Sequence, residues 1–321
     1  MSAESDRVTS LVVDTDLFSD VDDASALLLA CTLSNTSLVA VNINVNSAYS
    51  ALAASSILNY YGHSNVPIGL RRPYVNSSFF DTWAYELGEY ASKVAYHWSG
   101  GYVPWFEMEK TWDPVELYRQ TLSTAGDNSM TIASTGFLEN LSGLLNSTAD
   151  KFSELSGYQI VEKKVRELVV MGGAYPSGHE FNFFGDNPLS TAHVLNTWPK
   201  SVPVTYLGLE VGKKVSTGAR LVEGPAHDPV KAAYGWYVGY NTTRFSWDPL
   251  TVAYASQGLG TWFEYGNMDG YNFVWPNGSN IWIEDKNITN QHYLKLKMDN
   301  VTVAKELDDL FLRGAWVWAN A

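Results

Sequence analysis

TSLVVDTDLFSDVDDASALLLACTLS, residues 9–34, is the stretch that decides the fold. Residues 9–14 form a short apolar run that ends in an acid, which predicts a buried parallel strand. Small and apolar residues then recur at positions 24, 27, 28 and 31, which is the spacing of a helix that begins near Asp22. Two acids in the first turn of that helix favour its dipole. The stretch therefore predicts a strand, an acidic loop and a helix.

The same alternation continues along the chain. Residues 37–45 and 66–70 predict further strands, and residues 49–61 predict the helix between them. This opening predicts an α/β fold with a doubly wound, mostly parallel, Rossmann-like sheet flanked by helices. Later strands are expected at 129–134, 166–171 and 202–207, and later helices at 137–145, 190–196, 230–240, 248–256 and 305–319. Because there is no repeat and no linker, we expect one domain over residues 1–321.

Two segments are less regular. Residues 72–127 are rich in aromatic residues and glycine and show weak periodicity, and within them residues 72–102 predict a long irregular excursion near the site. Residues 258–300 alternate aromatic and polar positions, which predicts a small layer of β hairpins.

The composition excludes some classes of molecule as binding partners of the chain. The chain has 34 acidic and 21 basic residues and a formal net charge of -13. Its basic residues form no cluster larger than a pair, so we expect no nucleic acid as a partner. No apolar run reaches the length of a membrane span, so we expect no membrane partner. An acidic surface suits a neutral small molecule or a bound cation.

The sequence carries a signal about its compartment. Eight Asn-X-Ser/Thr sequons occur, roughly twice the number that composition alone would give. Residues 1–10 are polar and lack the apolar core of a signal peptide. We expect a secreted glycoprotein whose signal peptide lies outside this sequence, and the alternative is a cytoplasmic protein rich in Asn, Ser and Thr. The sequons begin at Asn35, Asn76, Asn140, Asn146, Asn241, Asn277, Asn287 and Asn300.

Five acids fall within residues 14–23, at the carboxyl end of the first predicted strand. Ligands of open α/β sheets bind at such ends. Packed carboxylates repel one another unless protons or a cation neutralise them, and hard oxygen ligands select Ca²⁺ or Mg²⁺. An EF-hand is excluded by Phe18 and Ser19 at its fifth and sixth positions. The alternative is a solvated acidic turn with capping aspartates.

DTDLFSDVDDASAL, residues 14–27, resembles the signature DxDPGxDDAxAL of the inosine-uridine preferring nucleoside hydrolase family, with a longer loop before the acid pair. Taken singly, the family-like segments have ordinary explanations, such as a helix cap at Asp248. Their occurrence in family order makes the resemblance specific. The later segments are VNINVNSAYS (41–50), SMTIASTGFLEN (129–140), LVVMGGAYPSGHEFNFFGD (168–186) and SWDPLTVAYA (246–255).

The resemblance implies calcium-dependent hydrolysis of the N-glycosidic bond of ribonucleosides, which releases free base and ribose, by a homodimer or another homo-oligomer. Asp14 is expected behind the site. By the match, Asp16 is the general base and a ligand of Ca²⁺, with Asp23, Asp248 and the carbonyl of Thr135 as further ligands. The residues expected to bind ribose are Asp22, Asn46 (or its neighbour Ser47), Glu180, Asn182 and Asp248.

Two departures from the family pattern concern the substrate. The segment before Glu180 is short, so the contact to the 5′-hydroxyl has no assigned residue. Trp247 stands where pyrimidine-active members have a histidine, which is similar to the purine-preferring branch. We therefore expect a purine nucleosidase in which Trp247 assists the leaving base. Trp98, in the aromatic excursion, is a further candidate for contacting the base.

Two other functions remain open at this point. The acid cluster is also close to the DxDx(T/V) pattern of Mg²⁺-dependent phosphohydrolases, with Asp14 as nucleophile, although Phe18 occupies the Thr/Val position. The chain could also be a non-catalytic, extracellular calcium-binding module. A calcium-replete assay on a panel of nucleosides distinguishes the three.

Overall fold

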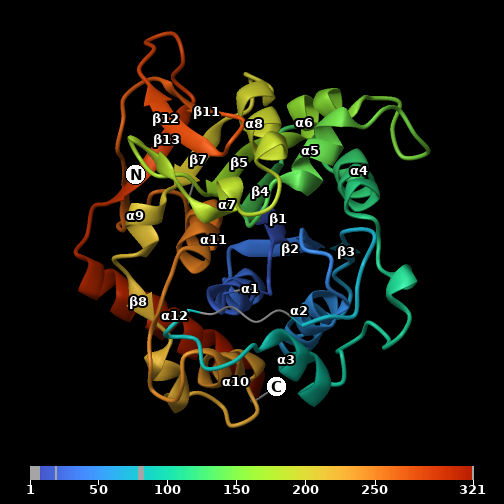
Figure 1. The fold of residues 1–321 in the computed structure, drawn as a ribbon, viewed down its shortest axis with the longest axis vertical. Coiled ribbons are helices and arrows are strands. Elements are labelled where there is room, and N and C mark those ends of the chain that lie inside the picture. The colour runs from blue at the N-terminus through green and yellow to red at the C-terminus, as the bar shows by residue number, and fades with distance from the viewer. Residues whose placement is uncertain (1–7, 19, 79–82, 320–321) are drawn as a thin grey trace.

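The computed structural model describes residues 8–18, 20–78 and 83–319. At its centre lies an eight-stranded sheet in which every neighbouring pair is parallel except the first (Figure 1). The predicted doubly wound, mostly parallel sheet is therefore confirmed. In order across the sheet, the strands are β10 (Phe263–Tyr265), β13 (Gln291–Leu296), β7 (Val204–Leu207), β5 (Val165–Met171), β4 (Met130–Thr135), β1 (Thr9–Thr15), β2 (Thr36–Ile43) and β3 (Ile68–Leu70).

Helices cover both faces of the sheet (Figure 1). One layer holds α1 (Asp22–Thr32), α2 (Ala48–Tyr60), α11 (Asp248–Gln257) and α12 (Asn300–Ala319), and the other holds α4 (Pro114–Thr124), α5 (Glu139–Asn146), α6 (Gly157–Lys164) and α8 (Pro188–Thr197). Strand β1 serves both cores, because successive side chains of a strand point to opposite faces. Leu11 and Val13 pack in the first core and Val12 in the second. No helix in the described part of the chain combines the length and the apolar character needed to cross a membrane.

The sheet reverses its winding between β1 and β4. The chain runs from β1 outward to β2 and β3, and then returns to the other side of β1 to form β4 and the strands beyond it. Thr15 of β1 is paired with Thr135 of β4, so the carboxyl ends of these strands meet at the switch point. A Cβ on Gly136 would lie 2.6 Å from the backbone nitrogen of Asp16, so only glycine allows this approach. Open α/β sheets bind ligands at such a point.

Three segments differ from the sequence-based expectation. Residues 258–300 do not form a separate hairpin layer, because β10 and β13 extend the main sheet. Only β11 (Tyr271–Val274) and β12 (Ser279–Ile283) form a small sheet, together with β6 (Ser177–His179). Helices α4 and α6 were not predicted, although both have local start signals: Asp113 before Pro114 caps α4, and a Ser156–Gln159 capping box begins α6.

The aromatic excursion is only partly irregular. It contains α3 (Ala91–His97), which packs against α2 and against α10 (Pro229–Tyr237). Residues 83–90 precede α3. Tyr85 and Tyr90 contact the ring of Tyr237 in α10, and the Tyr85 ring also contacts the guanidinium of Arg244 in β9 (Arg244–Phe245). The excursion thus brings residues from the first third of the chain to the last third.

A buried arginine in α4 holds the loop between α5 and α6. Arg119 is 2% exposed. Its Nε and Nη2 donate to the two carboxylate oxygens of Asp150 at 2.6 and 2.9 Å, and Nη1 donates to the Ser147 hydroxyl at 2.9 Å. Nη2 also donates to the carbonyls of Ser153 and Leu155, each at 3.0 Å. One side chain therefore donates hydrogen bonds to four residues of this loop.

We expect Arg119→Leu to lower the free energy of unfolding by about 3 kcal/mol, because it leaves buried acceptors and a carboxylate without their donor. The measurement is urea denaturation followed by circular dichroism. The control is Lys151→Ala, which removes an exposed pair with Glu116 and should change stability by less than about 1 kcal/mol. Equal effects of the two substitutions would contradict the structural role of Arg119.

Candidate active site

Four aspartates converge at the switch point. Asp16 directly follows β1, Asp22 and Asp23 begin α1, and Asp248 begins α11. Each is 5% exposed or less. One carboxylate oxygen from each of Asp16, Asp23 and Asp248 lies within 4.8 Å of the others. Two oxygens on opposite sides of one Ca²⁺ are about 5 Å apart, so this donor set fits a single hard divalent cation.

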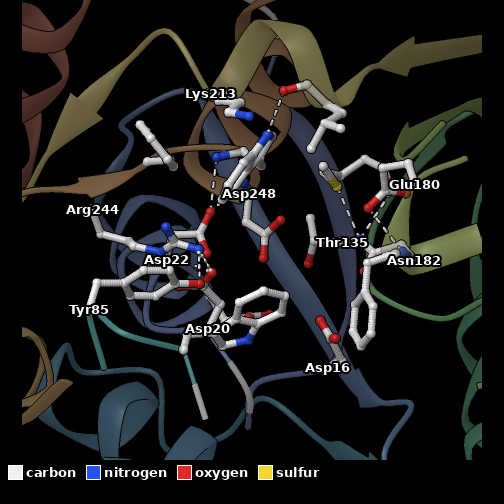
Figure 2. A pocket seen from close by; sticks show the side chains of 17 residues that line it. Asp16, Asp20, Asp22, Tyr85, Thr135, Glu180, Asn182, Lys213, Arg244 and Asp248 are labelled. Carbon is white, nitrogen blue, oxygen red and sulfur yellow. Dashed lines mark hydrogen bonds and ion pairs between the residues drawn. The ribbon is translucent and has the colours of Figure 1, made fainter. Parts of the chain in front are cut away.

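Hydrogen bonds fix the orientation of these carboxylates. Oδ2 of Asp22 accepts from the backbone nitrogens of Trp247 and Asp248 at 2.9 and 3.1 Å, which ties the start of α1 to the start of α11. Oδ1 of Asp23 accepts from the hydroxyl of Thr15 at the end of β1. Figure 2 shows Asp16, Asp22 and Asp248 around a common space. The two helix starts and the strand end thus hold the acids in fixed positions.

Burial and mutual repulsion disfavour the charged form of the cluster. Burial raises the pKa of Asp22 to about 8, and the charge of Asp20 adds to this shift. Burial also raises the pKa of Asp16, Asp23 and Asp248 well above the usual range, with further contributions from the neighbouring carboxylates. A bound cation would reverse these shifts, because it favours the ionised form of every ligand.

Asp14 has a different environment from the other acids. It is fully buried, and its carboxylate accepts hydrogen bonds from Asn44 and Tyr118, each at 2.7 Å, and from Asn140 at 3.2 Å. It does not line the cavity described below. Asp14 is therefore a buried support for the strand ends, and this placement argues against it as the nucleophile of a phosphohydrolase.

The buried Asn140 cannot carry a glycan in the folded protein.

A cavity of about 330 Å³ opens above the acid cluster. Glu180 precedes α7 (Phe181–Phe184), and its Oε1 and Oε2 accept from the backbone nitrogens of Asn182 and Gly173 at 2.9 and 3.1 Å. Burial raises the pKa of Glu180 to about 7. The structure therefore brings together most of the predicted site. The predicted residues that line the cavity are Asp16, Asp22, Asp23, Thr135, Glu180, Asn182, Trp247 and Asp248.

Two predicted substrate contacts lie elsewhere. Asn46 is exposed and donates to the carbonyl of Pro73 at 3.2 Å, because the chain has turned away from the cavity beyond β2. Its alternative, Ser47, caps α2. The asparagine that does reach the strand ends is Asn44, bonded to Asp14. Trp98 ends α3 and donates from its indole nitrogen to the carbonyl of His227 at 3.2 Å, outside the cavity lining.

The cavity also has lining residues that sequence reasoning missed. The excursion was expected near the site, but it contributes Trp83 and Tyr85 rather than Trp98. Asp20, which had no assigned role, lines the cavity together with Arg244 and Lys213. Arg244 lies two residues before the recognised SWDP segment, and no local pattern distinguishes it from a surface arginine.

Four aromatic residues that line the cavity form its aromatic wall: Trp83, Tyr85, Phe245 and Trp247. Trp247 is fixed in this wall by its neighbours. Its indole nitrogen donates to the carbonyl of Leu209 at 2.9 Å, which fixes the orientation of the ring. The ring meets that of Phe245 edge to face, with centroids 5.4 Å apart. No histidine occurs among the described residues that line the cavity. The arrangement offers flat apolar surfaces beside a cluster of acids.

Comparison with known proteins agrees with this site. Residues 11–315 match the model of the family described as inosine-uridine preferring nucleoside hydrolase. No curated protein sequence matches the chain. The fold is similar to that of an inosine-uridine preferring nucleoside hydrolase from Bacillus anthracis, at 17% identity and TM-score 0.66, covering 96% of this chain and 99% of that one. It is also similar to a purine-preferring ribonucleoside hydrolase from Gardnerella vaginalis, at 16% identity and TM-score 0.67, covering 98% and 100%.

The family match spans almost the whole chain, and the acids of its signature meet in one cavity. The chain therefore belongs to the inosine-uridine preferring nucleoside hydrolase family and is a hydrolase that acts on nucleosides.

Proposed function

We propose that the protein is a calcium-dependent nucleosidase that prefers purine ribonucleosides. The observation that carries the proposal is the composition of one cavity, in which a cluster of buried carboxylates faces a wall of aromatic side chains. The carboxylates suit a divalent cation and the hydroxyls of ribose. The aromatic rings suit a flat base.

The carboxylates of Asp16, Asp23 and Asp248, with the carbonyl of Thr135, would hold the cation. When bound, Ca²⁺ supplies Lewis acidity that makes a nearby water easier to deprotonate. Asp16 accepts the proton of the attacking water, since its carboxylate lines the cavity and accepts no hydrogen bond from any other described residue. The water oxygen then bonds to C1′ while the bond between C1′ and the base nitrogen breaks.

The ribose is held by the acids and the amide around the cluster. Asp22, Glu180 and Asp248 accept hydrogen bonds from its hydroxyls, and Asn182 can donate or accept. Their ionised carboxylates also stabilise the positive charge that develops on the ring in an oxocarbenium-like transition state. The backbone donors of Gly173, Asn182, Trp247 and Asp248 fix these carboxylates before the substrate arrives.

Purine preference follows from the aromatic wall. Trp247, with Trp83 and Phe245, offers π-faces to the base, and a purine has a larger face to stack than a pyrimidine. Each such contact contributes about 1 kcal/mol. The position of Trp98 gives it no part in this contact.

We expect kcat/KM for inosine, guanosine or adenosine to exceed that for uridine by about tenfold, because the larger purine face gains about 1.4 kcal/mol more from stacking on these rings. The assay measures free base and reducing sugar with Ca²⁺ in excess. Equal or faster cleavage of uridine would overturn the purine preference. Calcium binding in calorimetry without cleavage of any nucleoside would favour the non-catalytic module, and hydrolysis of a phosphate ester instead would favour the phosphohydrolase.

A further inference from the structure

A buried ion pair lines the cavity on the side opposite Glu180 and Asn182, next to Asp22. Arg244, in β9, is 8% exposed. Its Nε donates to both carboxylate oxygens of Asp20 at 2.9 and 3.0 Å, and its Nη2 also donates to Asp20. Figure 2 shows Arg244 and Tyr85 on the side of the cavity away from Glu180 and Asn182. If the ribose of a nucleoside lies against Glu180 and Asn182, its base extends toward Arg244.

The guanidinium lies among aromatic rings. Its central carbon is 4.2 Å from the centroid of the Tyr85 ring and 5.0 Å from that of Trp247. Nη2 also donates to the Tyr85 hydroxyl at 2.9 Å. Planar guanidinium groups stack on aromatic faces in this way, and the stacking fixes their plane. Arg244 is thus part of the same wall that would contact a base.

Among the described residues, one nitrogen of this guanidinium has no hydrogen-bond acceptor. Nε and Nη2 are engaged with Asp20 and Tyr85, whereas no acceptor for Nη1 occurs in the described part of the chain. Nη1 carries two hydrogens and cannot act as an acceptor. A buried, charged donor at the edge of an open cavity is suited to an acceptor on a ligand.

Asp20 is itself held in place by two further hydrogen bonds. Oδ1 of Asp20 accepts from the backbone nitrogen of Val21 at 2.7 Å, and its carbonyl accepts from the hydroxyl of the buried Tyr90 at 2.6 Å. This loop, residues 17–21, is the one that is longer than the family signature. Asp20, which comes from this longer loop, therefore holds Arg244 at a fixed place in the cavity.

We propose that Arg244 contacts the leaving base through Nη1 and selects 6-oxopurines, and that Asp20 is the positioning residue for Arg244. This inference rests on the proposed nucleosidase function. Hypoxanthine and guanine present two acceptors, O6 and N7, on one edge, whereas adenine presents a donor at N6 beside N7. A donor-only guanidinium matches the first edge and is left partly unpaired by the second.

The same contact assists the chemical step. When the bond to C1′ breaks, its electron pair goes to the base nitrogen, and the negative charge spreads over the base onto O6 and N7. The permanently charged Arg244 stabilises this anion without donating its proton. The base then takes a proton from solvent, while the proton of the attacking water remains on Asp16. Arg244 therefore affects kcat as well as KM.

The test compares Arg244→Gln, Arg244→Lys and Asp20→Asn on inosine, guanosine and adenosine, with thermal melting recorded for each variant. Arg244→Gln should lower kcat/KM for inosine and guanosine by about tenfold or more, and for adenosine by less. Arg244→Lys should recover only part of the loss, because the ammonium lacks the planar fork. Asp20→Asn should also lower the ratio of kcat/KM for inosine to kcat/KM for adenosine. A matched control is Arg220→Gln, which breaks ion pairs with Glu223 and Asp309 outside the cavity lining.

Two further results distinguish a contact between Arg244 and the base from a merely structural role of Arg244. Guanidinium ions added to Arg244→Gly should restore inosine cleavage, while they leave the Arg220 variant unchanged. The wild-type protein alone also tests the proposal, since it must cleave inosine faster than adenosine. An equal loss on all three nucleosides, or wild-type cleavage of adenosine at the rate of inosine, would overturn the role of Arg244. Failure of the wild-type protein to cleave any nucleoside would instead refute the proposed function.

Discussion

Asp16→Asn is expected to lower kcat for nucleoside hydrolysis by about 10²- to 10⁴-fold, the usual contribution of a general base. Asparagine has nearly the same shape but cannot accept the proton of the attacking water. The structure predicts that the fold survives, because the substitution removes one of several carboxylates that are buried together and repel one another. The melting temperature of the cation-free variant should therefore not fall.

The experiment measures single-turnover cleavage of inosine at increasing Ca²⁺. Asp16 is also a proposed ligand, so weaker calcium binding alone could reduce the rate at low calcium. Saturating Ca²⁺ should restore binding but not the rate. Restoration of the rate would assign the base to another residue. The control is Glu116→Gln, an exposed acid paired only with Lys151 among the described residues, which should leave the rate unchanged.

Removal of divalent cations is expected to abolish cleavage and to make stability depend on pH. In the cation-free protein, burial raises the pKa of Asp22 to about 8 and that of Glu180 to about 7. The corresponding values in the unfolded chain are about 4. The folded state therefore binds more protons than the unfolded state between these values. The stability from these groups is fully present below about pH 4 and is lost as the pH rises toward 8.

Calcium should counter this loss, because a cation held by Asp16, Asp23 and Asp248 favours the ionised form of the carboxyls around it and binds the folded state only. The increase in melting temperature on adding Ca²⁺ should be larger at pH 8 than at pH 6. Differential scanning fluorimetry with chelator, Ca²⁺ or Mg²⁺ at both pH values measures this directly. If adding Ca²⁺ at pH 8 leaves the melting temperature unchanged, or if activity persists in chelator, a cation site at Asp16, Asp23 and Asp248 is contradicted.

Much of the architecture could be read from local pattern. The apolar run of β1 and the helical spacing after it predicted the first strand and helix, because burial on both faces of a parallel strand leaves a direct mark on the sequence. Helices α4 and α6 also begin at local capping signals, so their starts can be read from the sequence. The role of β13 could not be read in this way. Alternation predicts a strand, but only the tertiary structure pairs Gln291–Leu296 in parallel with β7.

The site, too, has one part that the sequence predicts and another that only the tertiary structure shows. The sequence alone determined its acidic centre, since Asp16, Asp22 and Asp23 lie within one short stretch, and the ordered family segments added Glu180, Asn182 and Asp248. Only the tertiary structure decided which side chains face the base. It brings Arg244 to Asp20 across 224 residues and leaves Asn46 and Trp98 outside the cavity. The physical reason is that contacts between distant segments depend on how the layers pack, and no periodicity or cap in either segment records them.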